Sequence, residues 1–152
     1  MLRLATPKDL HALLAIENAM FDPAVYDRLT EEALAKLLQK PSTALYVWEA
    51  DGNIVGYALG IVIAKKRIWF NSLAVLKEYQ STEAAKRLFA AIEVHALTHN
   101  LDTVILEIRD DNRALLRRYK GMGYCEWKRI PGYYPDGSSA IRMLKKMDGP
   151  QA

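Results

Sequence analysis

The spacing of apolar residues along the chain changes several times, and each change marks a predicted helix or strand. Apolar residues that recur every three or four positions are typical of a helix with one buried face. Shorter runs rich in aromatic and β-branched residues are typical of strands. On this basis we predict helices over residues 7–20, 30–40, 82–99 and 112–120, and strands over residues 2–5, 44–50, 54–64, 68–75, 103–109, 124–130 and 140–146.

Residues that favour helix starts and turns support these limits. Thr6 precedes Pro7, a pairing that is common where a helix begins, and Thr30 and Asn112 are suited to cap the helices that follow them. The run Asp-Gly-Asn at residues 51–53 is a strong signal for a hairpin between two strands.

The order of these elements predicts an α/β (α+β) fold in a single domain. Three strands in succession precede the helix over residues 82–99, and two strands end the fold. The strands over residues 68–75 and 103–109 should be parallel, because a helix crosses between them. We therefore expect a mixed sheet of six or seven strands with helices on both faces. The domain should span residues 1–147, followed by a tail over residues 148–152.

Composition and charge narrow the class of protein. A chain of 152 residues with 51% hydrophobic residues fits one domain with a sizeable core. The net charge is only +3 and acidic residues alternate with basic ones, so no stripe for nucleic acid is present. No apolar run approaches the roughly 20 residues of a membrane span. Cys125 is the single cysteine, which fits a reducing compartment, and we predict that it is buried. We expect a cytoplasmic protein that binds neither nucleic acid nor a membrane.

The stretch over residues 71–92 organises the chain, because a strand there leads through a short turn into a helix. The turn is predicted over residues 77–81 and the helix should begin near Thr82. The first N–H groups of a helix have no partner within it, and the helix dipole favours negative charge at that end. A phosphate-bearing ligand is therefore expected at residues 80–86, with Lys86 and Arg87 close by.

Two residues are candidates for acid–base chemistry. Glu107 lies near the carboxyl end of an interior strand, where α/β sheets place their ligand crevice. It could act as a general base, or it could form a structural ion pair with Arg109 or Arg142. Tyr119, on the next helix, could donate a proton to a leaving group, or it could pack in the core with its hydroxyl at the surface. The sequence leaves both pairs of interpretations open.

Other polar residues give weaker signals. His95 and His99 have the spacing of two metal ligands on a helix, but no third ligand accompanies them. We predict no metal site, and we expect both histidines at the solvated end of their helix. Ser138 and Ser139 lack the glycine frame of a serine nucleophile.

Taken together, the chain resembles the GCN5-related N-acetyltransferase (GNAT) superfamily, and within it the ribosomal-protein-alanine (protein N-terminal) acetyltransferases. Four pieces carry the resemblance, and the last two are the more specific. They are Asn-Ser-Leu-Ala-Val at residues 71–75, Gln-Ser-Thr-Glu-Ala-Ala at residues 80–85, Leu-Glu-Ile-Arg-Asp-Asp-Asn at residues 106–112 with Tyr119 and Gly123-Tyr124, and Gly-Tyr-Tyr-Pro-Asp-Gly at residues 132–137 with Ala140 and Met143.

The resemblance implies transfer of an acetyl group from acetyl-CoA to a primary amine, either a protein N-terminus or a small molecule, by direct attack of the amine. Glu107 matches the family's proton acceptor and Tyr119 its proton donor. The positions that match cofactor contacts are Leu73, Ala74, Val75, Gln80, Ser81, Thr82, Glu83, Ala84, Ala85, Lys86 and Asn112. Tyr133, Tyr134 and Asp136 are candidates for the acceptor site.

The main departure from the family pattern is Glu83, which stands where the pyrophosphate loop has a glycine. A side chain there could crowd the phosphates, and two like charges 4 Å apart repel by about 1 kcal/mol even in water. A second hypothesis is therefore a binding module with this fold and weakened or absent catalysis. Such a module would act as a CoA sensor, a partner-binding subunit or a homodimeric scaffold. Ser138 and Ser139 also replace an acidic pair of the family pattern.

Overall fold

The computed structural model describes residues 1–64 and 66–147. The strands are β1 (Leu2–Leu4), β2 (Ala44–Ala50), β3 (Asn53–Ile63), β4 (Arg67–Val75), β5 (Thr103–Arg109), β6 (Cys125–Ile130) and β7 (Ala140–Lys146). The helices are α1 (Leu10–Met20), α2 (Glu31–Gln39), α3 (Ala84–Thr98) and α4 (Arg113–Gly121), with short 3₁₀ turns η1 (Pro7–Asp9) and η2 (Lys77–Tyr79). The predicted tail over residues 148–152 lies outside the described residues.

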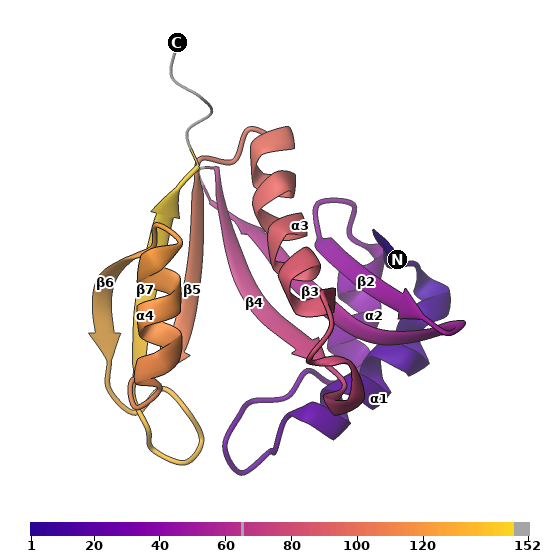
Figure 1. Ribbon diagram of the computed structural model, residues 1–152, viewed down its shortest axis with the longest axis horizontal. Coiled ribbons are helices and arrows are strands. Elements are labelled where there is room, and N and C mark those ends of the chain that lie inside the picture. The colour runs from indigo at the N-terminus through magenta and orange to yellow at the C-terminus, as the bar shows by residue number, and fades with distance from the viewer. Residues whose placement is uncertain (65, 148–152) are drawn as a thin grey trace.

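The strands form one mixed sheet of seven strands, as the sequence predicts. Their order across the sheet is β1-β2-β3-β4-β5-β7-β6 (Figure 1). Neighbouring strands are antiparallel except β4 and β5, which are parallel, because α3 crosses between them.

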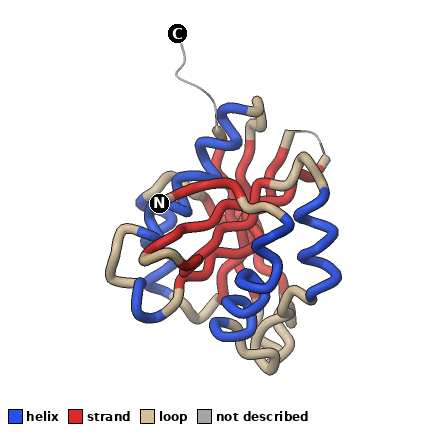
Figure 2. The backbone as a smooth tube through the Cα atoms, turned by 90° about the vertical axis from the view of Figure 1, so that its right-hand side faces the viewer, coloured by secondary structure: helices blue, strands red, loops and turns tan. Residues whose placement is uncertain are grey.

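Helices cover both faces of the sheet (Figure 2). Beneath α3, the apolar residues Leu88, Ile92 and Ala96 are fully buried against strand residues such as Ile68 and Val104. On the opposite face, α1 and α2 bury Leu13, Ile16 and Leu34 against Val47, Tyr57 and Leu59. The helical spacing of these apolar residues is thus what fixes α3 on one face and α1 with α2 on the other.

The sheet opens between β4 and β5, and this opening positions the candidate site. The two strands pair only through Arg67, Ile68 and Trp69 on β4, after which they diverge (Figure 1). At that point the register between β3 and β4 shifts, so that Asn71 is an extra residue on β4. Such a bulge bends a strand and increases its twist, which turns β4 away from β5.

Three predictions about local structure are wrong. The helix begins at Ala84 rather than near Thr82, because the Thr82 hydroxyl donates to the carbonyl of Tyr79, 2.5 Å away, and continues the η2 turn. Cys125 is exposed, because β6 is an edge strand of the sheet. His95 is buried: the residue is only 7% exposed and its Nδ1 lies 2.9 Å from the hydroxyl of Tyr46. Among the described residues, no helix is both long and apolar enough to span a bilayer.

Candidate active site

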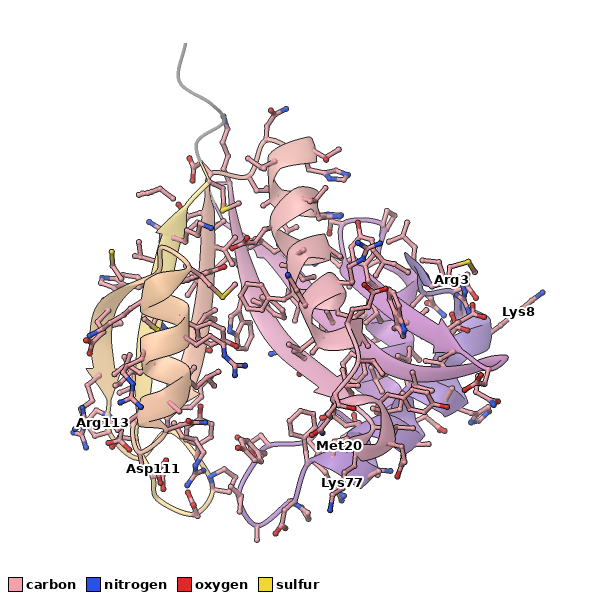
Figure 3. All side chains as sticks on the ribbon, in the orientation of Figure 1. Arg3, Lys8, Met20, Lys77, Asp111 and Arg113 are labelled. Atoms are coloured by element: carbon pink, nitrogen blue, oxygen red, sulfur yellow. The ribbon has the colours of Figure 1, made fainter. Side chains whose placement is uncertain are left out.

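A cavity of about 830 Å³ occupies the opening between β4 and β5. Its walls come from β4, β5, α4 and the loops that follow α1 and β6. In Figure 3, Asp111 and Arg113 lie on one side of this opening and Met20 and Lys77 on the other. The residues on its walls include Glu17, Phe21, Tyr26, Trp69, Leu73, Gln80, Glu107, Arg109, Asn112, Leu115, Tyr119, Tyr133 and Tyr134.

Glu107 lies on β5 with its side chain only 7% exposed, and it borders the cavity. Its Oε1 accepts hydrogen bonds from the indole N–H of Trp69 at 2.7 Å and from the hydroxyl of Tyr133 at 3.3 Å. Its Oε2 accepts one from Nε of Arg142 at 2.8 Å. Glu107 thus has the ion pair with Arg142 that the structural interpretation requires, and also the cavity position that a base requires.

Tyr119, on α4, also borders the cavity. Its ring stacks on Phe89 of α3 with centroids 5.4 Å apart, and it packs close to Tyr124. Burial raises the pKa of the Tyr119 phenol above its usual value near 10, and the nearby Arg118 lowers it by less. The phenol is therefore protonated at neutral pH, as a proton donor must be.

The segment between β4 and α3 provides donors for an anionic ligand. The first N–H bond inside α3 runs from Arg87 to the carbonyl of Glu83, at 3.0 Å, so the helix does not use the N–H groups of its first residues. The Ala84 N–H lies 3.3 Å from the Thr82 hydroxyl. Lys86 and Arg87 are exposed beside this turn. Unpaired N–H groups, a helix N-terminus and two cations are a donor set that fits a diphosphate.

Glu83 does not distort this segment. Its φ of −76° and ψ of 0° lie in the right-handed region that any L-residue adopts, so the backbone needs no glycine here. Its side chain is exposed. The backbone thus does not require a glycine at position 83, whereas the expected repulsion and crowding of a diphosphate by this side chain stay a prediction.

The side chains of two other predicted cofactor contacts, Gln80 and Asn112, form hydrogen bonds with backbone groups. Gln80 borders the cavity, and its amide nitrogen donates to the carbonyl of Val75 at 2.9 Å. Asn112 also borders it, and its Oδ1 accepts from the N–H of Leu115 at 3.1 Å, which caps α4 as predicted. Leu73 borders the cavity, while Ala74 and Val75 are buried. Beyond Trp69, the β4 edge toward β5 has no paired strand, so its backbone groups can bind a ligand.

The loop between β6 and β7 brings Tyr133 and Tyr134 to the cavity wall, whereas Asp136, the third predicted acceptor residue, is not among the residues that line the cavity. Burial, together with the neighbouring Glu107, raises the pKa of Tyr133 to about 12. Asp136 is exposed, and its Oδ2 lies 2.6 Å from Nη2 of Arg109, which lowers the pKa of the Asp136 carboxyl to about 2. Asp136 thus binds Arg109 and fixes its loop to β5.

Several cavity residues were not identified from the sequence. The guanidinium of Arg109 lies over the rings of Tyr26 and Tyr134, 5.7 and 4.9 Å from their centroids, so it joins the loop after α1 to the loop after β6. Glu17 is buried on α1, where its carboxylate accepts hydrogen bonds from the hydroxyl of Tyr57 and the N–H of Leu29. These contacts cross the whole fold, and local sequence patterns carry no signal for them.

Comparison with known proteins decides the family. The pattern of the acetyltransferase (GNAT) family matches residues 10–124. The chain belongs to the GNAT family.

Two relatives and one solved structure extend this result to most of the chain. An uncharacterised N-acetyltransferase of Methanocaldococcus jannaschii is 33% identical over 150 residues, which are 95% of this chain and 90% of the relative. An N-alpha-acetyltransferase of Sulfurisphaera tokodaii is 30% identical over 118 residues, 70% of this chain and 71% of the relative. The ribosomal-protein-S18-alanine N-acetyltransferase of Escherichia coli superposes with a TM-score of 0.86 at 21% identity, covering 99% of this chain and 96% of that one.

This GNAT protein is therefore an acetyltransferase, and acetyl-CoA is the acyl donor of its family. The single-domain GNAT fold predicted from the sequence is confirmed. Within residues 1–64 and 66–147, no group of three or more His, Cys, Asp and Glu side chains is arranged to hold a metal ion. The stacked rings of His95 and His99, with centroids 3.9 Å apart, cannot direct their nitrogen lone pairs at one ion.

Proposed function

We propose that this GNAT protein is an N-alpha-acetyltransferase, which moves the acetyl group of acetyl-CoA to the free amine of a protein N-terminus. The observation that carries the proposal is that the Glu107 carboxylate and the Tyr119 phenol border the same cavity, in the opening between β4 and β5. The relative from Sulfurisphaera tokodaii, which is named an N-alpha-acetyltransferase, supports the choice of acceptor.

Glu107 is proposed as the proton acceptor. An N-terminal amine with a pKa near 8 is largely protonated at neutral pH and cannot attack a carbonyl carbon in that form. Glu107 removes a proton from the ammonium, through a water molecule, and the free amine then forms the new C–N bond. The nearly buried carboxylate of Glu107 is charge-balanced by Arg142, which offsets the cost of burying its charge.

Tyr119 is proposed as the proton donor. When the thioester C–S bond breaks, the thiolate of CoA leaves, and a phenol that stays protonated at neutral pH can supply its proton. The phenol regains its proton from solvent after the product has left. The stacking of Tyr119 on Phe89 fixes the ring, so the hydroxyl is presented to the cavity in one orientation.

Binding of the donor is assigned to β4 and the start of α3. The unpaired edge of β4 around Leu73 is suited to hydrogen-bond the amides of the pantetheine arm. The N–H groups of Ala85 and Lys86, in the first turn of α3, are suited to the diphosphate, with the Lys86 and Arg87 side chains adding positive charge. Asn112, at the start of α4, would contact the same ligand from the opposite wall.

Binding of the acceptor is assigned to the aromatic side of the cavity. Tyr133 and Tyr134 border it next to Glu107, and their rings can contact an ammonium group. Asp136 is bound to Arg109 and is proposed to hold the loop in place.

The test is a comparison of peptides that differ only at the N-terminus. Each peptide is mixed with acetyl-CoA and the protein, and released CoA thiol is followed with a thiol reagent. The proposal predicts thiol release with free N-terminal peptides and none above background when the same α-amine is already blocked. Equal release from free and blocked peptides would overturn it, and release with small-molecule amines alone would assign a different acceptor.

A further inference from the structure

The carboxylate of Glu107 is held by side chains from three separate parts of the fold. Trp69 reaches it from β4, Arg142 from the neighbouring strand β7, and Tyr133 from the loop between β6 and β7. Arg142 lies directly opposite Glu107 in the pairing of β5 with β7. Trp69 is the last residue through which β4 pairs with β5, so its indole spans the point at which the two strands separate.

These contacts fill most of the hydrogen-bonding capacity of the carboxylate. An ionised carboxylate has about four acceptor positions, two on each oxygen. Oε1 receives the indole N–H of Trp69 and the hydroxyl of Tyr133, at 2.7 and 3.3 Å. Oε2 receives Nε of Arg142 at 2.8 Å. The remaining acceptor position is therefore on Oε2, and its direction is set by the residues that occupy the other three.

We propose that Trp69 and Arg142 are positioning residues for Glu107. Trp69 holds Oε1 against β4, the strand assigned to binding acetyl-CoA. Arg142 orients Oε2 and supplies the opposite charge that a nearly buried carboxylate requires. Together they leave one acceptor position for the proton that is removed from the amine. This inference rests on the proposed role of Glu107 as the base.

A simple structural role for the two residues would have different consequences. If Trp69 and Arg142 served only to stabilise the sheet, their replacement would lower thermal stability and change kcat to the same degree whether or not Glu107 is present. If they act by orienting Glu107, their replacement changes kcat only while the carboxylate is there. The distinguishing experiment is therefore a double-mutant cycle.

The variants are Trp69→Phe, which keeps an aromatic ring and removes the N–H, Arg142→Met, which keeps the length and removes the charge, and Arg142→Lys, which restores the charge. Each is made in the natural protein and in Glu107→Gln. The matched controls are Trp127→Phe and Arg129→Met, at exposed positions on the edge strand β6. The readouts are kcat, KM for acetyl-CoA, KM for a free N-terminal peptide, and the thermal midpoint.

A hydrogen bond to a charged group corresponds to a change of about 10- to 100-fold. We expect Trp69→Phe and Arg142→Met to lower kcat by about 10- to 100-fold with KM for acetyl-CoA unchanged, and Arg142→Lys to recover part of the loss. In the Glu107→Gln background the same changes should lower kcat by no more than about twofold. The two β6 controls should retain full kcat.

Two results would overturn the proposal, and they are distinguishable. In the first result, Glu107→Gln lowers kcat, but Trp69→Phe and Arg142→Met either leave kcat unchanged or lower it equally in the presence and absence of Glu107. The positioning role is then wrong and the base assignment stands. If Glu107→Gln itself leaves kcat unchanged, the base assignment and the positioning role both fail.

Discussion

At the scale of single residues, Glu107 shows why a carboxylate in an ion pair can still be a candidate base. Its pairing with Arg142 offsets the hydration that an ion loses on burial, and it borders the cavity, where it is accessible to a ligand. The sequence alone presents the ion pair and the catalytic role as alternatives. The structure shows that the ion pair with Arg142 and a position on the cavity wall occur together, so the two interpretations do not exclude each other.

The first prediction concerns Glu107→Gln. The amide is nearly the same size as the carboxylate but cannot accept a proton, so kcat/KM for a free N-terminal peptide should fall by about 10²- to 10⁴-fold. Initial rates of thiol release measure the effect. Binding of acetyl-CoA, followed by titration calorimetry, should be retained, because Glu107 is not among the residues assigned to the donor. A loss of both would mean that the variant is misfolded or that Glu107 holds the donor.

The second prediction concerns Tyr119→Phe. The ring still stacks on Phe89, so the fold and the binding of acetyl-CoA should be kept. The reaction, however, loses its proton donor, which lowers kcat. We expect kcat to fall by about 10²-fold, at the lower end for a general acid, because water can replace the donor in part. Steady-state kinetics at saturating peptide measure it. Tyr124→Phe would be a poor control, because Tyr124 packs against Tyr119 itself. Tyr79→Phe is the better one, because its hydroxyl donates to Asp51 and neither residue lines the cavity.

At the scale of elements, the strands and helices were predictable because their apolar faces are buried. The face of α3 that includes Leu88, Ile92 and Ala96 is an example, as is the hairpin at residues 51–53. His95 lies three residues after Ile92, on the buried face, and this spacing could have corrected its predicted exposure. The exposure of Cys125 could not be found this way, because it depends on β6 being the last strand across the sheet.

The third prediction concerns the segment that leads into α3. Glu83 has an ordinary helical backbone, so we expect its effect on a nearby diphosphate to be mainly one of charge. We expect Glu83→Gly to tighten CoA binding, and Glu83→Gln, which removes only the charge, to do so by a similar factor. Titration calorimetry at two salt concentrations measures both. Tightening by glycine alone would show that the backbone matters, and unchanged affinity would show that Glu83 points away from the ligand.

The fourth prediction concerns the contact between α3 and β2. Burial lowers the pKa of His95 below its usual value near 6.5, and the stacked His99 adds to the effect. The unfolded chain therefore binds a proton at this residue more readily than the folded protein does. The neutral, buried His95 ring therefore contributes to the free energy of unfolding above pH 6.5. This contribution is lost as the pH falls through the lowered pKa of His95.

Urea unfolding at pH 7.5 and pH 5.5 tests this. The midpoint should be lower at pH 5.5, and His95→Gln should reduce the difference between the two pH values. His11→Gln, at an exposed position on α1, is the matched control and should leave the difference unchanged. An equal pH dependence in the natural protein and His95→Gln would contradict the prediction.

At the scale of the whole molecule, the site depends on an opening in the sheet that no local pattern predicts. The resemblance to the family placed Glu107 and Tyr119 as a pair, and both border one cavity. The cavity contacts of Trp69 and Glu17 were missed, and Arg109 was named only as a possible partner of Glu107, whereas it binds Asp136. The partners concerned lie 27 or more residues away along the chain, so these contacts appear only in the folded protein. The sequence thus identifies candidates for the chemistry, and the fold adds the residues that position them.

The most direct test of the proposed function is to locate the acetyl group on a product. A peptide with a free N-terminus and an internal lysine is incubated with acetyl-CoA and the protein, and the product is sequenced by fragment mass spectrometry. We predict acetylation of the first residue's α-amine, with the lysine unmodified, and the same product formed about 10²- to 10⁴-fold more slowly by Glu107→Gln. Acetylation of the lysine, or no acetylation of any free N-terminal peptide in a broad panel, would contradict the assignment of an N-terminal acceptor.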